Sequence, residues 1–179
     1  MIKFLMLSAL LLVAGLSSAA TNSNSRALTT VTIVNPDSTR LVELDQFWTE
    51  LMRTVREGDF EGYSALYHQD AVVAFGFGKK PGSMPVATAL SSWKKGFVDT
   101  KAGKQSDRVE FRFSQRIGDA TTAHETGMFI FSSSDPEGKE KFRYVCHFEM
   151  LLVKRNGKWL AVMEYQKSKG SEADWEALK

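Results

Sequence analysis

Hydrophobic residues recur with two different periods in this chain, and the change of period separates a helical part from a strand-forming part. Apolar residues spaced by three and four predict helices over 41–56, from Asp59 to Tyr67, and over 85–98. After residue 107 they alternate with polar residues, which is typical of strands half covered on one face. The alternation predicts four strands, at Arg108–Ile117, Thr121–Ser132, Phe142–Arg155 and Trp159–Gln166.

Shorter patterns complete the predicted element order. A strand of mostly β-branched and aromatic residues is expected over 71–75, followed by a loop over 76–83 that is rich in glycine and proline. Gly58 ends the first helix and Asp59 caps the second. Asn156-Gly157 predicts a tight hairpin turn, and residues 172–178 predict a short C-terminal helix whose Trp175 needs cover.

The N-terminus has the three-part pattern of a secretory signal. One positive charge at Lys3 precedes an apolar run over 4–16 and then the small residues of 17–20. A retained membrane anchor is the alternative, but a membrane span needs about 20 apolar residues. We therefore expect a signal peptide at 1–20, a flexible leader at 21–37 and one domain at 38–179. The location would be secreted or periplasmic, with no membrane contact after cleavage.

Charge and cysteine content limit the partners. The chain has 23 basic and 21 acidic residues, and this near-balance gives no reason to expect nucleic acid as a partner. The single Cys146 cannot form an internal disulfide, so the apolar core must stabilise an exported fold alone. No motif indicates a cofactor, and the His and acidic residues lack the compact spacing of a zinc site. We expect neither a cofactor nor a metal.

Three local strings sharpen the fold assignment: Gly58-Asp59-Phe60-Glu61, then Leu66 to Val73, and Asn156-Gly157-Lys158-Trp159. In their order and spacing they resemble the nuclear transport factor 2-like (NTF2-like) superfamily, especially its exported SnoaL-like and DUF4440-type members, over about residues 38–168. The resemblance implies an α+β, cystatin-like fold, in which a cone-shaped curved antiparallel sheet wraps around three N-terminal helices and a pocket opens at one end. It also implies frequent homodimers, and functions that range from isomerases, dehydratases and hydrolases to non-catalytic modules.

One enzyme of that superfamily is disfavoured by its own motif. The steroid isomerases place an Asp base, a Tyr and a second, proton-donating Asp at positions that correspond here to Phe75, Leu51 and His147. None of the three residues matches, so the resemblance does not carry over that mechanism.

Candidate acid–base residues lie on the predicted strands. If the hairpin turn centres on Pro136-Glu137, His124 faces Glu149 and Thr126 faces His147, with Cβ atoms roughly 5 Å apart. A histidine beside a carboxylate is a candidate general base or proton shuttle. Glu164 lies between apolar neighbours of the last strand, where a charge is costly unless paired. The competing interpretation is a structural hydrogen-bond network or a solvent-facing surface.

The resemblance suggests that this face lines the pocket, with four further side chains as ligand-binding candidates: Trp48, Tyr67, Trp93 and Gln166. The other face of the long strand carries Phe142, Tyr144, Cys146, Phe148, Met150 and Leu152. It is too apolar for water, so we predict that a second copy covers it in a homodimer. If those residues face the helices instead, the pocket assignment inverts.

Two functional hypotheses follow. The leading one is an exported protein that binds a small apolar ligand, with acid–base turnover by His147, His124, Glu149 and Glu164. The alternative is a non-catalytic dimeric module that binds a protein or peptide.

Overall fold

The protein is described from a computed structural model that covers residues 36–78 and 81–178. The predicted signal peptide at 1–20 lies outside the described residues, as does most of the predicted leader. The last two residues assigned to that leader, Pro36 and Asp37, belong instead to the first helix.

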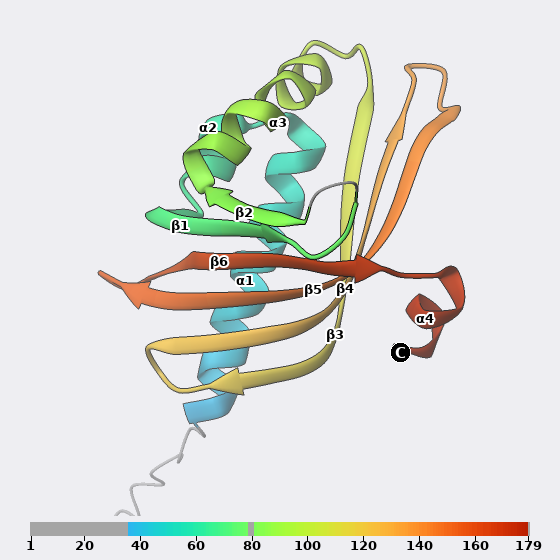
Figure 1. Ribbon diagram of the computed structural model, residues 1–179. Coiled ribbons are helices and arrows are strands. Elements are labelled where there is room, and N and C mark those ends of the chain that lie inside the picture. Colours follow the sequence, from blue (N-terminus) through green and yellow to red (C-terminus); the bar gives the residue numbers. More distant parts are fainter. Residues whose placement is uncertain (1–35, 79–80, 179) are drawn as a thin grey trace, which may run out of the picture. The chain divides into compact units, whose positions relative to one another are not determined.

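Helices and strands follow the predicted order with one strand added (Figure 1). The elements are α1 (Pro36–Glu57), α2 (Phe60–Ser64), β1 (Tyr67–Phe75), β2 (Gly82–Pro85), α3 (Val86–Lys101), β3 (Ser106–Gly118), β4 (Thr122–Ser134), β5 (Glu140–Arg155), β6 (Lys158–Lys169) and α4 (Glu172–Ala177). None of the described helices is long and apolar enough to cross a membrane.

The main departure from the predicted boundaries lies between α2 and β1. Tyr67 was assigned to the second helix and instead begins β1. Ala65 is the C-cap of α2, and the carbonyl of Leu66 already accepts a hydrogen bond from the amide of Ala161 in β6, at 2.9 Å. Pairing with a distant strand thus overrides the local helical spacing, as tertiary contacts often do.

All six strands form one curved sheet in the order β2-β1-β6-β5-β4-β3. Neighbours are antiparallel except for β1 and β6, which run parallel, so the expectation of an antiparallel sheet holds with one exception. β2 pairs with β1 over Val72–Phe75, and its first two residues, Gly82 and Ser83, belong to the segment expected to be a loop. Figure 1 shows α1 lying across one face of the sheet and α4 on the other side.

The helix-facing side of the sheet carries the main core. Phe148, Met150 and Leu152 of β5 are at most 2% exposed and pack with α1 and α3. The predicted assignment of the two faces of β5 is therefore wrong, and the stated inversion applies. Both faces of β5 carry apolar residues, but only the face turned away from the helices also carries His147 and Glu149. These polar side chains remain hydrated on that face.

The outer face of the sheet is partly covered by α4. Its Trp175 is 5% exposed and packs on Met128, Ile130 and Val145. The prediction that this side chain is buried is confirmed. Ser171 and Asp174 form a capping box at the start of α4. The guanidinium of Arg112 lies 4.4 Å from the Trp175 ring centroid and donates to its carbonyl at 2.6 Å. These contacts fix the C-terminal helix on the sheet.

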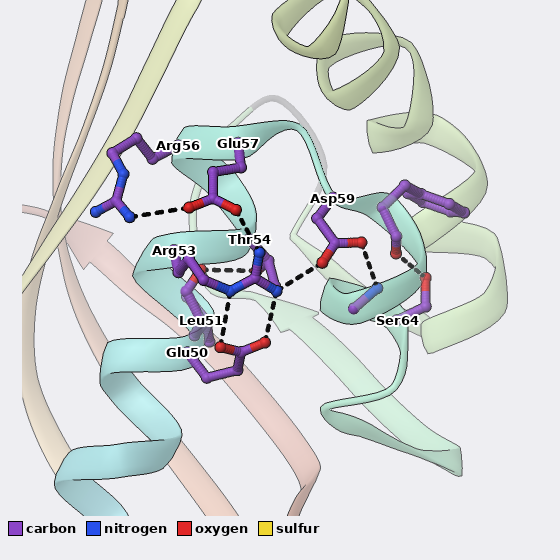
Figure 2. A network of polar contacts seen from close by, with 10 residues as sticks. Glu50, Leu51, Arg53, Thr54, Arg56, Glu57, Asp59 and Ser64 are labelled. Carbon is purple, nitrogen blue, oxygen red and sulfur yellow. Dashed lines mark hydrogen bonds and ion pairs between the residues drawn. The ribbon is translucent and has the colours of Figure 1, made fainter.

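The junction of α1 and α2 is tied together by Arg53 (Figure 2). Its guanidinium donates to the carboxylates of Glu50, Glu57 and Asp59, at 2.6, 2.5 and 2.6 Å. Asp59 also accepts from the amide of Gly62 at 2.9 Å and so caps α2, as predicted. One cation therefore orients the short helix that carries Tyr63 into the core.

A buried carboxylate joins α1 to β3 and β4. Glu125 of β4 is fully buried, and its Oε2 accepts from Trp48 Nε1 at 3.1 Å and from Arg116 Nε at 2.7 Å. Its Oε1 has no hydrogen-bond partner in the described part of the chain. The Trp48 ring packs on the rings of Phe111 and Phe148, at centroid distances of 4.5 and 5.6 Å.

We expect Arg116→Met to destabilise the protein by about 3 kcal/mol, because it leaves the Glu125 carboxylate buried without a countercharge. The double variant Arg116→Met with Glu125→Met should be more stable than the single one, since it removes the unpaired charge as well. Urea unfolding followed by circular dichroism measures both. A double variant no more stable than Arg116→Met would contradict this account of the ion pair.

Candidate functional site

A cavity of about 580 Å³ lies between the helices and the inner face of the sheet. Its lining comes from α1, α2, α3 and five of the six strands, and is rich in aromatic side chains. Ten aromatic side chains contribute: Tyr63, Tyr67, Trp93, Phe97, Phe111, Phe129, Phe131, Phe142, Tyr144 and Phe148. A largely apolar cavity with a few polar groups is the usual form of a small-molecule site.

The principal polar group of the cavity is Glu164 on β6, which is 7% exposed. Its Oε2 accepts from the hydroxyl of Tyr67 at 2.5 Å, and its Oε1 accepts from Gln166 Nε2 at 2.9 Å. The hydroxyls of Tyr63 and Tyr67 lie 3.1 Å apart. With the Tyr67 proton directed at Glu164, Tyr63 is the donor in that second bond. A chain of hydrogen bonds thus runs from α2 to the carboxyl.

Burial changes the acid–base properties of this chain of hydrogen bonds. It raises the pKa of the Glu164 carboxyl above its ordinary value, although the hydrogen bonds from Tyr67 and Gln166 act in the opposite direction. Burial also raises the pKa values of Tyr63 and Tyr67, and the nearby Glu164 adds to both shifts. Both phenols therefore remain protonated donors, and Glu164 is the member best able to exchange a proton.

A second carboxyl lines the cavity at another place. Asp107 at the start of β3 is 5% exposed, and its Oδ2 accepts from Gln105 Nε2 at 2.8 Å. Sequence reasoning missed it. The alternation of Val109, Phe111 and Phe113, extended back by two residues, would have placed Asp107 on the cavity face.

Four of the predicted site residues line the cavity, namely Tyr67, Trp93, Glu164 and Gln166. Trp48 does not line it. Its indole packs against two of the lining rings and binds Glu125, so its role in the described structure is in the core.

The other predicted site residues, His124, His147 and Glu149, do not line the cavity and lie on strand positions that alternate with the buried ones. His124 Nε2 is 3.3 Å from Glu149 Oε2, so the predicted contact is present. His147 Nε2 lies 3.8 Å from Asp174 Oδ2 of α4. These residues therefore do not form one cluster with each other or with Glu164.

The predicted register between β4 and β5 is wrong by two residues. Glu149 faces Thr126, and His147 faces Met128. The connecting loop spans 135–139, and the register shifts between Ser133 and Ser134, so the turn is wider than a tight turn centred on Pro136-Glu137. Because the error is an even number of residues, each side chain keeps its face, and His124 still meets Glu149 diagonally.

Neither a cysteine nucleophile nor a metal site is supported by the described residues. Burial raises the pKa of Cys146 to about 11, which disfavours a thiolate nucleophile. Within residues 36–78 and 81–178 there is no group of three or more His, Cys, Asp or Glu side chains placed to hold a metal ion.

Comparison with known proteins adds the fold but not a function. No family model matches the chain, and no curated protein matches it in sequence. Among solved structures it resembles an NTF-2 like protein of unknown function from Shewanella oneidensis, with a TM-score of 0.56 and 16% identity over 70% of this chain and 97% of that one. It also resembles Aln2 from a Streptomyces species, with a TM-score of 0.58 and 16% identity over 74% and 91%.

A third similar structure is a protein from Catenulispora acidiphila in complex with S-DNPA. The TM-score is 0.53, with 16% identity over 71% of this chain and 91% of that one. At such identities the likeness concerns architecture. The helices packed on one curved sheet and these three neighbours together identify the chain as a protein of the NTF2-like fold.

Proposed function

We propose that this protein is exported, to the periplasm or the medium, and binds a small, largely apolar molecule in its aromatic cavity. The observation that carries the proposal is the buried Glu164 held by Tyr67 and Gln166 within a lining rich in aromatic side chains. The N-terminal signal pattern supports export. A protein of the same fold has been solved with S-DNPA bound.

We extend the proposal to acid–base turnover of the ligand, with Glu164 as the group that gives or takes the proton. Tyr67 would keep the carboxyl in place and stabilise its charged form through the short hydrogen bond. His124, His147 and Glu149, first considered for this role, do not line the cavity. The reaction class would be an isomerisation, dehydration or hydrolysis of SnoaL-like type.

A second candidate function is a non-catalytic dimeric module, and a row of side chains on the outer sheet face favours it. Strand register aligns Val72, Met163, Leu151, His124 and Ile117 across five strands. Val72, Leu151 and Ile117 are 41, 40 and 48% exposed. The row is apolar except for His124, and such a row across a sheet is a surface that a second copy can cover.

The ligand-binding proposal predicts that 2-naphthol, an apolar molecule with one hydroxyl, binds the purified protein. Glu164→Gln should weaken its binding at least tenfold, because the carboxylate is the stronger hydrogen-bond acceptor. His147→Ala, a change outside the cavity lining, should leave it unchanged. Isothermal titration calorimetry measures all three, and native mass spectrometry of protein from its own cells would show the natural ligand. Absence of naphthol binding, or equal losses in both variants, would contradict the proposal.

The raised pKa of Glu164 predicts a pH-dependent effect on stability. Below the ordinary pKa the carboxyl is neutral in both states. As pH rises, the unfolded chain ionises first, and stability falls until the folded pKa is passed. The Tm of Glu164→Gln relative to the unmodified protein should therefore rise between pH 4 and pH 8.

Glu149→Gln is the matched control for that measurement. The hydrogen bond from Lys167, and secondarily the one from His124, lowers the pKa of Glu149, so its contribution is present above the ordinary pKa and is lost as pH falls. The relative Tm of this variant should fall between pH 4 and pH 8. Slopes of the same sign for the two variants would show that burial does not raise the pKa of Glu164.

The dimer proposal predicts that Leu151→Asp converts a dimer into a monomer, because it places a charge in the middle of the apolar row. Val98→Asp is the control, since Val98 is exposed on α3 rather than on the sheet. Sedimentation equilibrium gives the mass of each variant. A monomeric parent protein, or a dimer that survives Leu151→Asp, would refute a dimer through this face.

A further inference from the structure

The charge of the cavity lining is one-sided. Two carboxyl groups line it, those of Glu164 and Asp107, whereas the described lining residues include no Lys, Arg or His. Ten aromatic side chains make up most of the remaining wall. Aromatic faces and carboxylates both attract cations, and neither attracts anions.

Asp107 has an oxygen that the described structure leaves without a partner. The residue is 5% exposed, and its Oδ2 is engaged by Gln105, but Oδ1 finds no hydrogen-bond donor among residues 36–78 and 81–178. A buried carboxylate oxygen without a donor is costly, so a donor supplied by a ligand would offset that cost. Glu164 differs, because its two oxygens already accept from Tyr67 and Gln166.

Phe142 lies in the same cross-strand row as Asp107, two strands away. Strand register places Asp107 opposite Ser133, and Ser133 opposite Phe142. The ring of Phe142 lies 6.2 Å from that of Phe131, and Phe142 is 52% exposed, so this end of the cavity adjoins solvent. A cation entering here would exchange water for one carboxylate and nearby ring faces, which is the environment that binds organic ammonium groups.

The two carboxyls belong to different cross-strand rows of the cavity wall. Phe142 belongs to the cross-strand row of Asp107, and Met150 to that of Glu164. These two positions are eight residues apart on β5, so the two carboxyls lie at different places along the cavity wall. A ligand that reaches both is elongated, with polar groups at its two ends.

We propose that the cavity selects an organic cation, an amine with an aromatic or apolar body, whose ammonium group binds Asp107 and whose other end reaches Glu164. The proposal rests on the proposed small-molecule function and adds the chemical class of the ligand. Anionic molecules of the same shape are excluded by the two carboxyls.

Three probes of equal body size test this by isothermal titration calorimetry on the purified protein: 2-(2-naphthyl)ethylammonium, 2-(2-naphthyl)ethanol and 2-naphthylacetate. The ammonium should bind at least tenfold more tightly than the alcohol, and the acetate should not bind measurably. Asp107→Asn should remove the preference for the ammonium while leaving the affinity for the alcohol within about twofold.

Asp99→Asn is the matched control, because Asp99 also belongs to the α3–β3 region but does not line the cavity and pairs with Lys95. It should keep the preference for the ammonium. Thermal melts verify that both variants are folded. If Asp107→Asn does not fold, the order of the three probes on the unmodified protein decides alone.

The outcomes separate the two proposals. Tighter binding of the ammonium, lost in Asp107→Asn and kept in Asp99→Asn, supports the selection of a cation by Asp107. Equal binding of alcohol and ammonium, or an unchanged preference in Asp107→Asn, overturns it and leaves the small-molecule function standing. Failure of all three probes and of 2-naphthol overturns both.

Discussion

The buried carboxylate of Glu125, which accepts hydrogen bonds from both Trp48 and Arg116, is the group on which the described domain depends most. It connects α1 with β3 and β4 and has no access to water. The indole of Trp48 supports two rings of the cavity wall. Because α1 also contributes Leu51 and Val55 to that wall, the position of the helix sets the width of the cavity. A polar contact in the core thereby keeps an apolar space open beside it.

The sheet has two faces with different chemistry, and this division explains the candidate site. Aromatic rings gather on the inner face, where the only carboxyls among the described lining residues are Glu164 and Asp107. Histidines and paired charges such as Glu149 with Lys167 lie outside this lining. Acid–base residues are therefore present in two places, but of the four predicted from the sequence only Glu164 lines the cavity, where a ligand can reside. Enclosure, more than residue type, selects it.

Periodicity predicted most elements because most of the helices and strands carry an apolar stripe or an alternation of apolar and polar residues. Glu164 was recognisable as a charge between apolar neighbours on a strand. The inner and outer faces of β5 could not be told apart from the sequence, because Val145 and Leu151 on one face are about as apolar as Phe148 and Met150 on the other. The register error arose in the five residues of 135–139, where the width of the turn depends on a shift that no local pattern reveals. β2 was hidden because Gly82 and Pro85 are typical of loops.

The hydrogen bond between Tyr67 and Glu164 joins residues 97 apart in the chain, and β1 reaches its place beside β6 only when almost the whole domain is available. Contacts of such long sequence separation form late, because loop closure costs entropy before the contact is made. A chain emerging from a ribosome or a translocation channel would thus build its long meander before it has a ligand site. Competence to bind would appear in the last step of folding, which couples the function of this protein to its completion.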